Sequence, residues 1–219
     1  MTLQLNNLRE TFLRLVILFC GLSIAHLGVT LFLLDDLGAD HFNVFVQGVR
    51  ILADNALGLS LTHGTIHMII CFAIIIILLL SYRSYIKSGT VICMLCGGPI
   101  IDFFMIILNG LNITGSGLPV KIPVLILGCV ILSFGMTIVI RSEAGTGPND
   151  LVSVVISEKG GFKFGLTRMI TDGLFVVIGF VLGGKFGIGT VICAFLVGFV
   201  ADFFMPYSAK IVKSCLKMI

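Results

Sequence analysis

Charged residues are scarce in this chain of 219 residues, where lysine, arginine, aspartate and glutamate together make up 11% of the sequence. A soluble globular domain carries about 25% of such residues, so too few are present to cover the surface of a water-soluble protein. Hydrophobic residues reach 58%, and the mean hydropathy is +1.16. The composition therefore indicates an integral membrane protein whose principal partner is the lipid bilayer.

Basic residues are also few, with 14 lysines and arginines and a net charge of +3. This number gives no dense basic face, so binding to nucleic acid is not expected. The sequence contains no His-Glu-x-x-His and no Gly-x-Ser-x-Gly motif, so neither a zinc protease nor a serine hydrolase is indicated. We expect a protein that is not an enzyme, with no catalytic residues and no cofactor.

Seven cysteines are present, and most of them lie in apolar runs, where a thiol behaves as a small hydrophobic group. They do not predict a disulfide framework. Cys93 and Cys96 have the spacing of a metal-binding pair, but no further ligands accompany them, and a structural zinc site needs four. No metal site is expected.

Long apolar runs dominate the remainder of the sequence. A membrane-spanning helix needs about 20 mainly apolar residues, and six stretches approach or meet this length: 15–34, 66–82, 91–111, 122–140, 166–182 and 188–207. Two shorter apolar segments, 42–53 and 149–157, are too short to cross a bilayer. Each is either an interfacial helix or a half-helix that enters the membrane and returns, and the latter requires a cavity lined by protein.

An internal repeat organises the chain. Gly-Thr-Val-Ile-Cys at residues 89–93 recurs at 189–193, and Asp-Phe-Phe-Met at 102–105 recurs at 202–205, both with a shift of 100 residues. Weaker similarity aligns residues 36–39 with 143–146, which places Asn43 opposite Asp150, and residues 64–68 with 165–169. The chain therefore divides into a first repeat at 1–117 and a second at 118–219, each with three spans and one short helix.

The distribution of basic residues predicts the orientation. With six crossings and a cytoplasmic amino terminus, the cytoplasmic side holds Arg9, Arg14, Arg83, Lys87, Arg141, Lys159, Lys163, Lys210, Lys213 and Lys217. The outer side holds Arg50, Lys121 and Lys185, and Arg168 lies within a span. Because each repeat has an odd number of spans, the two repeats must be inverted relative to each other. We expect an all-α membrane protein of six helices in two inverted three-helix repeats, with both termini cytoplasmic.

Two aspartates occupy equivalent positions deep inside apolar spans. Asp102 and Asp202 lie about 11 residues beyond the start of their spans, which is about 16 Å of helix and close to the middle of the bilayer. A charged group costs about 2.5–3.5 kcal/mol at such a depth. Each aspartate either relays a proton or cation or binds the solute, or it serves only packing, as a protonated group or as the cap of a neighbouring break in the backbone.

The fifth span contains a second set of charges. Arg168 and Asp172 are four residues apart on one helical face, so they can pair with each other. Alternatively, Arg168 binds an anion, because His67 occupies the equivalent position in the first repeat. His26 in the first span is interpreted as a histidine that serves helix packing.

Residues 143–150, Glu-Ala-Gly-Thr-Gly-Pro-Asn-Asp, form the richest local motif. Thr146 or Gly147 suits a helix cap, and Pro148 suits the first helical position. Asn149 and Asp150 then lie in the first turn. The motif is either an ordinary helix start or a half-helix whose N–H groups and Asn149 contact a solute. It lacks the Lys-Ser/Thr ending of a phosphate-binding loop.

Residues 145–150, the stretch 165–171 and Gly-Ile-Gly-Thr at 187–190, followed by Asp-Phe-Phe at 202–204, resemble the YczE/YyaS/YitT-like bacterial integral membrane proteins. The resemblance covers nearly the whole chain and is strongest over 120–207. An aromatic residue commonly follows Gly-Pro in that family, where this chain has Asn149, and Asp40-His41 replaces Gly-Pro in the first repeat. The resemblance implies a multi-pass protein of the bacterial inner membrane and no particular substrate.

The leading hypothesis is a transporter, or less favourably a channel, for a small polar or charged solute at the interface of the repeats. Proton or cation coupling is assigned to Asp102 and Asp202. Solute binding is assigned to residues Arg168, Asp172, His67, Gly147, Asn149, Asp150 and Asn43. The alternative is a membrane scaffold or regulatory subunit that transports nothing. The sequence leaves open the sign of the solute's charge, and a homodimer is compatible with so small a chain.

Overall fold

The structure is a computed structural model that describes residues 2–38, 40–58, 61–162 and 164–217. Within these ranges the side chains of residues 2–7, 57, 164–166, 168, 169, 195 and 202 are not described. The elements are α1 (Thr2–Asp35), α2 (His41–Leu57), α3 (His63–Tyr82), α4 (Ser88–Leu108), α5 (Leu118–Ser142), α6 (Pro148–Gly160), α7 (Phe164–Val181) and α8 (Ile188–Leu216), with short 3-10 turns at Arg83–Tyr85, Asn109–Leu111 and Ile113–Gly115. The described residues contain no strand, so the all-α prediction is confirmed.

Four helices in the described part of the chain are long and apolar enough to cross a membrane: Leu8–Asp35, His63–Tyr85, Ser88–Leu111 and Leu118–Ser142. Helix α8 adds a fifth if its two arms, Ile188–Ala201 and Phe203–Leu216, form one span with a bend of 48°. Pro206 explains this bend, because its ring displaces the carbonyl group four residues earlier. The apolar stretch found in α7, Ile170–Val181, is shorter than a span.

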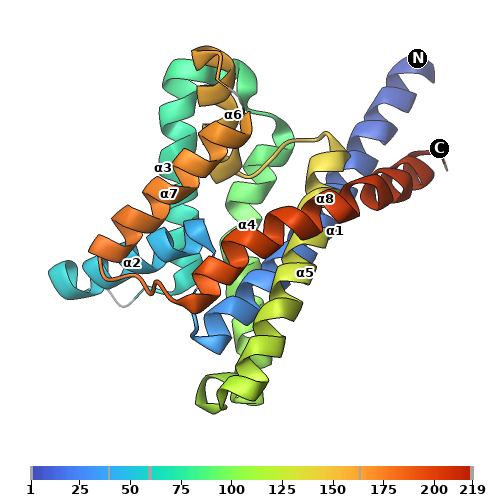
Figure 1. The fold of residues 1–219 in the computed structure, drawn as a ribbon. Coiled ribbons are helices and arrows are strands. Elements are labelled where there is room, and N and C mark those ends of the chain that lie inside the picture. Colours follow the sequence, from blue (N-terminus) through green and yellow to red (C-terminus); the bar gives the residue numbers. More distant parts are fainter. Residues whose placement is uncertain (1, 39, 59–60, 163, 218–219) are drawn as a thin grey trace.

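Helices α1 and α5 pack closely along the middle of the molecule (Figure 1). Glycines spaced seven residues apart permit this contact, Gly21 and Gly28 on α1 and Gly128 and Gly135 on α5. A Cβ atom at Gly28 would lie 2.5 Å from the backbone nitrogen of Leu132. Small residues of this kind let two helix backbones approach each other within a membrane. The two halves of the chain therefore meet backbone to backbone.

The remaining helices surround this central pair. Helix α4 packs against α1 and helix α8 against α5, while α2 lies beside α7 and α3 contacts α4 and α6. In Figure 1, α1 and α5 run in opposite directions, and so do α3 and α7 and also α4 and α8. Many large apolar side chains point outward, among them Leu80 at 84% exposure and Phe199 at 83%. Such a surface suits contact with lipid rather than water.

Two turns that follow the central helices have the same backbone geometry. Asp36 after α1 and Glu143 after α5 both adopt the left-handed conformation, with φ of 59° and 58°. Two residues later, Gly38 and Gly145 have φ of +129° and +149°, which side chains other than glycine rarely allow. The weak sequence similarity between 36–39 and 143–146 therefore corresponds to a shared backbone conformation.

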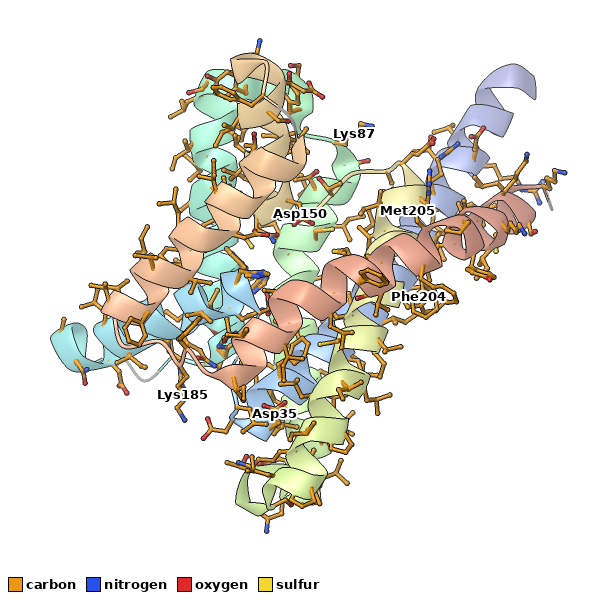
Figure 2. All side chains as sticks on the ribbon, viewed as in Figure 1. Asp35, Lys87, Asp150, Lys185, Phe204 and Met205 are labelled. Carbon is orange, nitrogen blue, oxygen red and sulfur yellow. The ribbon has the colours of Figure 1, made fainter. Side chains whose placement is uncertain are left out.

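Each of these turns contacts a helix of the other half. The carbonyl oxygen of Ala144 accepts the N–H of Gly89 at 3.0 Å, at the start of α4. The carbonyl oxygen of Leu37 accepts the N–H of Gly189 at 2.9 Å, at the start of α8. These contacts satisfy N–H groups that a helix start leaves unpaired. Lys87 and Lys185, which precede α4 and α8, mark the two contacts at separate ends of the molecule (Figure 2).

The two short helices begin where the sequence predicts them. Helix α2 starts at His41 and continues to Leu57, four residues beyond the predicted segment. Helix α6 starts at Pro148, with Gly147 as its N-cap, and ends at Gly160. Both helices point away from the centre of the molecule, with their amino-terminal ends inside it (Figure 1).

Candidate functional site

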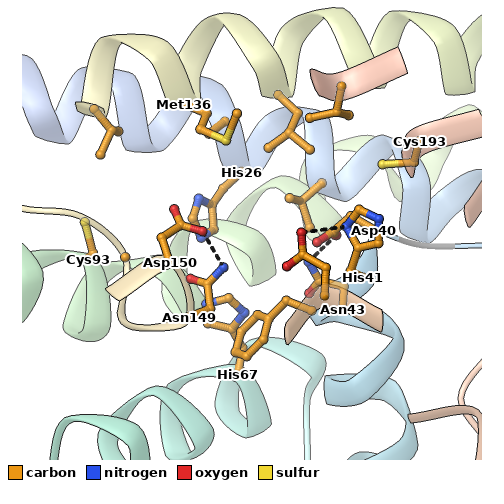
Figure 3. A pocket seen from close by; sticks show the side chains of 18 of the residues that line it. His26, Asp40, His41, Asn43, His67, Cys93, Met136, Asn149, Asp150 and Cys193 are labelled. Atoms are coloured by element: carbon orange, nitrogen blue, oxygen red, sulfur yellow. Dashed lines mark hydrogen bonds and ion pairs between the residues drawn. The ribbon is translucent and has the colours of Figure 1, made fainter. Parts of the chain in front are cut away.

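A cavity of about 570 Å³ lies between the two halves, where the amino-terminal ends of α2 and α6 face each other (Figure 3). Helices α1, α3, α4, α5, α7 and α8 complete its wall. Its charged and hydrogen-bonding residues are His26, Asp40, His41, Asn43, His67, Asn149, Asp150 and Asp172. The remaining lining is mostly apolar, which is typical of pockets that bind small molecules.

A chain of side-chain hydrogen bonds forms the α2 side of the cavity. Nδ2 of Asn43 donates to Oδ1 of Asp40, the N-cap of α2, at 2.5 Å. Oδ1 of Asn43 lies 2.7 Å from Nε2 of His63. Because Asn43 uses its amide nitrogen as a donor, its oxygen accepts, and Nε2 of His63 carries the proton. Asp40 is therefore held in place from α3 through Asn43.

The α6 side has a related arrangement. Gly147 is the N-cap, Pro148 occupies the first turn, and Nδ2 of Asn149 donates to Oδ1 of Asp150 at 3.0 Å. The glycine gives Asn149 the space it needs, since a Cβ at Gly147 would lie 2.8 Å from Oδ1 of Asn149. Asp150 lies in the first turn, where the helix dipole stabilises a negative charge. Both short helices thus present an aspartate that accepts a hydrogen bond from a neighbouring asparagine.

A third carboxylate reaches the cavity from α7. Oδ2 of Asp172 lies 3.8 Å from Nδ1 of His41, the first residue of α2. This contact joins α7 to the start of α2, and both residues line the cavity. It becomes an ion pair only when His41 is protonated.

Two histidines from the first half complete the polar lining. Nδ1 of His26 lies 3.0 Å from the carbonyl oxygen of Leu22, so this nitrogen donates and Nε2 carries a lone pair. Nε2 of His26 and Nδ1 of His67 are buried and have no hydrogen-bond partner. Their rings are 5.6 Å apart in an edge-to-face arrangement. Gly97 makes room for them, because a Cβ there would lie 2.9 Å from Nε2 of His26.

Among the described residues, the carboxylates that line the cavity have no lysine or arginine beside them in the lining. Three aspartates line it, and no described lysine or arginine does. No group of three histidine, cysteine, aspartate or glutamate side chains in the described part of the chain is arranged to hold a metal ion. The described polar lining thus consists of carboxylate, imidazole and amide groups.

Most of the residues proposed from the sequence come together here. The cavity is lined by Asn43, His67, Gly147, Asn149, Asp150 and Asp172. The side chains of Arg168 and Asp202 lie outside the described residues. The predicted pairing of Arg168 with Asp172, and the predicted approach of Asp102 to Asp202, therefore stay predictions.

Asp102 lies away from the cavity and caps helix α3. Its Oδ1 accepts the backbone N–H of Gly64 at 3.0 Å, and its Oδ2 accepts the hydroxyl of Thr62 at 2.6 Å. Thr62 is the N-cap of α3. Of the two interpretations of Asp102 made from the sequence, the geometry corresponds to the capping one.

Three polar residues of the lining were not among the predicted site residues: His26, Asp40 and His41. His26 was interpreted as a packing residue, and its Nε2 is buried against Gly97 of α4 without a hydrogen-bond partner. Asp40 and His41 replace the Gly-Pro of the second repeat at the start of the short helix. The alignment of Asn43 with Asp150 could have identified Asp40 and His41 as site residues, because it puts them opposite Gly147 and Pro148 at the start of α6.

Two equivalent pairs of helices beside the cavity are packed differently: α3 and α4 touch each other, whereas α7 and α8 are apart. Gly64 on α3 and Gly98 on α4 touch, and a Cβ on either would collide with the other's carbonyl oxygen. At Gly198 on α8, the repeat equivalent of Gly98, a Cβ would meet no atom of the described residues within 4 Å. Gly198 lines the cavity together with Gly173 of α7. The cavity therefore extends between α7 and α8, whereas α3 and α4 close its other side.

Comparisons with known proteins agree with a membrane protein. YczE of Bacillus subtilis, described as an uncharacterized membrane protein, is 29% identical over 215 residues, which cover 94% of this chain and 91% of that protein. An uncharacterized protein of Haemophilus influenzae is 26% identical over 195 residues, covering 89% and 84% of the two chains. The uncharacterized protein YyaS of B. subtilis is 23% identical over 186 residues, covering 85% and 89%. No solved structure matches the chain.

The family model described as "Family of unknown function (DUF6198)" matches residues 12–206. This range spans most of the helices and every residue that lines the cavity. The resemblance noted from the sequence motifs is thereby confirmed. The chain is a multi-pass membrane protein and belongs to the DUF6198 family.

Proposed function

We propose that the protein is a membrane transporter for a small polar or charged solute, and that the cavity between α2 and α6 is its binding site. The observation that carries this proposal is the difference between two equivalent helix pairs beside the cavity. The pair α3 and α4 is in contact at Gly64 and Gly98, and the pair α7 and α8 is apart at Gly198. A site closed on one side and open on the other is the minimum that alternating access requires.

Inverted repeats explain how the protein reaches a second state, in which the opposite side of the cavity is open. The sequence repeat, the opposite directions of the equivalent helices in Figure 1 and the matching turns at Gly38 and Gly145 all support two halves of inverted topology. In such a protein each half can adopt the arrangement of the other, which exchanges the open side. In the second state, α7 and α8 would meet at Gly198 while α3 and α4 separate.

In this exchange between the two states, we assign Asp102 and Asp202 the role of helix caps. Asp102 holds the start of α3 against α4 through Gly64 and Thr62. Asp202 is its equivalent in the sequence repeat, and Gly165 is the equivalent of Gly64. In the second state Asp202 would cap α7 in the same way. Breaking one cap while forming the other keeps the free-energy difference between the two states small.

The orientation follows the distribution of basic residues. The amino-terminal part of α1 and the carboxy-terminal part of α8 lie at the same side of the molecule (Figure 1), and Arg14 and Lys213 line a common hollow there. We place this side in the cytoplasm and the protein in the bacterial inner membrane. Under this orientation α7 also crosses the membrane, which makes six spans in total, and α2 and α6 are re-entrant helices whose amino ends face each other inside the bilayer.

Cysteine accessibility tests the exchange without a known solute. In a variant whose seven native cysteines are replaced, single cysteines are introduced as Ala194→Cys on α8 and Met94→Cys on α4. Ala194 is exposed and lines the cavity, whereas its equivalent Met94 is 6% exposed and packed among α2, α3 and α4. A membrane-impermeant maleimide is added to one face of native vesicles at a time. We expect Ala194→Cys to react from one face and Met94→Cys to react, more slowly, from the opposite face.

Leu125→Cys is the matched control, because Leu125 on α5 is fully buried and packs at the central helices. Its cysteine should stay unmodified from both faces. A scaffold without a second state predicts that Met94→Cys also stays unmodified until the protein unfolds. That result, or modification of both test cysteines from the same face only, would overturn the transporter proposal.

A further inference from the structure

We propose that a hollow formed by the amino-terminal part of α1 and the carboxy-terminal parts of α5 and α8 binds the headgroup of an anionic phospholipid. The hollow is separate from the cavity between α2 and α6. The inference rests on the proposed function only for the orientation, which places this side of the molecule in the cytoplasm. It does not depend on transport.

The hollow has a volume of about 420 Å³ and joins the two halves of the chain, since α1 belongs to the first half and α5 and α8 to the second. Figure 1 shows the carboxy-terminal part of α8 beside the amino-terminal part of α1. Four basic and two acidic side chains line the hollow, which gives a formal charge of +2. They are Glu10, Arg14, Arg141, Glu143, Lys213 and Lys217.

Both acidic side chains of the hollow bind the same arginine. Arg14 forms ion pairs with Glu10 and with Glu143, each at 2.9 Å. Among the residues that the structure describes, no carboxylate forms an ion pair with the other three basic residues, Arg141, Lys213 and Lys217. Three positive charges around one hollow repel one another, and an anion that binds there relieves this repulsion.

A phosphate group suits these three side chains. Arg141 can donate two parallel hydrogen bonds to two phosphate oxygens, and each lysine adds a positive charge with several N–H donors. Basic pockets between membrane-spanning helices on the cytoplasmic side bind anionic lipid headgroups in this way.

The depth of the two arginines agrees with the level of lipid phosphates. Arg14 lies 21 residues before Asp35, the end of α1, and Arg141 lies 23 residues after Leu118, the start of α5. At about 1.5 Å per residue these separations are about 31 Å and about 35 Å of helix. The hydrocarbon core is about 30 Å thick. If the far ends of both helices lie at one surface of the core, both arginines lie at the other, among the headgroups.

The walls of the hollow are held in place by contacts within the protein. Oγ of Ser208 on α8 lies 2.7 Å from Oγ1 of Thr137 on α5, and both side chains are buried. Val212, directly before Lys213, is 3% exposed. On the opposite wall, Arg14 also donates to the carbonyl oxygen of Ser142 at 2.9 Å. The helices that carry the basic residues are therefore positioned before a ligand binds, which lowers the entropy cost of binding.

The neighbouring surface favours a phospholipid over a free phosphate ion. Ile140, which precedes Arg141, is exposed, and so are Tyr207 and Ile211 on the same arm of α8 as Lys213. Tyrosine is common where a membrane protein crosses the lipid–water interface. The acyl chains of a bound phospholipid would cover such apolar side chains, whereas a phosphate ion would leave them uncovered.

Thermal unfolding of the purified full chain in detergent tests the proposal. Dioleoylphosphatidylglycerol is the anionic lipid, and dioleoylphosphatidylcholine has the same acyl chains and phosphate but no net charge. Sodium phosphate supplies the anion without acyl chains. We expect phosphatidylglycerol to raise the unfolding midpoint more than either of the other probes, because a ligand stabilises the state that it binds.

Titration of phosphatidylglycerol into variants locates the site. Arg141→Gln and Lys213→Gln should each lower the apparent affinity about fivefold, the usual contribution of one basic residue near an anionic membrane. Lys210→Gln is the matched control, because Lys210 is exposed on the same arm of α8 but does not line the hollow. It should leave the affinity nearly unchanged, whereas general attraction between a basic surface and the lipid predicts equal losses in all three variants.

Equal stabilisation by the two lipids, stabilisation by sodium phosphate as large as that by phosphatidylglycerol, or equal losses in the three variants would overturn the inference. The comparison of probes on the unaltered protein decides it even if a variant does not fold. The maleimide experiment on Met94→Cys reports on the cavity and not on this hollow. A failure of the lipid site is therefore distinguishable from a failure of the transporter proposal.

Discussion

The two halves of this protein contain the same sequence motif in the equivalent helices α4 and α8 but pack it differently. Gly98 on α4 is buried against Gly64 of α3, whereas Gly198 on α8 is exposed, and a Cβ there would contact none of the residues that the structure describes. Met94 is buried and its equivalent Ala194 is exposed. The comparison teaches that the motif itself does not determine whether its helix pair is closed. Two packings of one motif are therefore compatible with this sequence.

Other parts of the two halves are alike. The turns at Asp36 and Glu143 share a conformation, and each turn binds the helix start of the opposite half. The glycine contacts between α1 and α5 join the halves along their length. The halves thus match in these turns and in the central contact, while the packing difference described above lies in helices beside the cavity.

The largest expected effect comes from adding a methyl group at the closed contact. Gly98→Ala places a Cβ against the carbonyl oxygen of Gly64, so we expect it to separate α3 from α4 at a cost of about 1–3 kcal/mol. Gly198→Ala meets open space and should leave stability nearly unchanged. Thermal unfolding in detergent measures both, and equal destabilisation by the two changes would contradict the asymmetry.

The matching turns predict matching losses. Gly38→Ala and Gly145→Ala each force a side chain into a positive φ and toward a backbone nitrogen, that of Thr190 at 2.8 Å or Thr90 at 2.6 Å. We expect each to destabilise the protein by about 1–3 kcal/mol, since such conformations are strained for residues other than glycine. Gly58→Ala is the control, because Gly58 also has a positive φ but a Cβ there would meet no described atom within 4 Å. If only one of the two substitutions lowered the stability, the two turns would not be structurally equivalent.

A smaller effect is expected at the α3 cap. Asp102→Asn keeps the shape of the side chain but weakens the bonds to the N–H of Gly64 and the hydroxyl of Thr62. The expected cost is about 1 kcal/mol, the usual value of an N-cap. If the cap also holds the closed state, this variant should increase maleimide modification of Met94→Cys. A rate that stays the same would restrict Asp102 to local helix stability.

The smallest effects are expected at two ion pairs beside the turns. Arg14 pairs with Glu143 at 2.9 Å, and Lys185 pairs with Asp36 at 2.5 Å. Both pairs are partly exposed, so Arg14→Met and Lys185→Met should each cost less than about 1 kcal/mol. Arg14→Met should cost more, because Arg14 also donates to the carbonyl oxygen of Ser142. Chemical denaturation of the two variants side by side checks this order.

Much of the fold could be predicted because it depends on local patterns. Apolar runs of membrane length locate the long helices, and Gly147-Pro148 marks the start of α6. The repeat predicts a matching helix in the first half, and α2 begins at His41 as expected. The separation of α7 from α8 could not be predicted, because it depends on which of two packings the chain adopts.

The part of the site that could be predicted also depends on local sequence patterns. Asn149 and Asp150 belong to a helix start that the sequence makes visible, and both line the cavity. Asp40 was missed because the first half lacks the Gly-Pro signal at that point. The role of Asp102 could not be decided from the sequence, since capping of Gly64 requires α3 and α4 to lie against each other.

The exchanged contacts of the two turns have a consequence for biosynthesis. The N–H of Gly89 has no hydrogen-bond partner until the ribosome adds Ala144, 55 residues later. The carbonyl oxygen of Leu37 lacks its partner for even longer, until Gly189 is added. The first half therefore enters the bilayer with the start of α4 incomplete and cannot mature ahead of the second half. Expressed as two separate polypeptides, neither half should survive quality control in the membrane unless the other is made beside it.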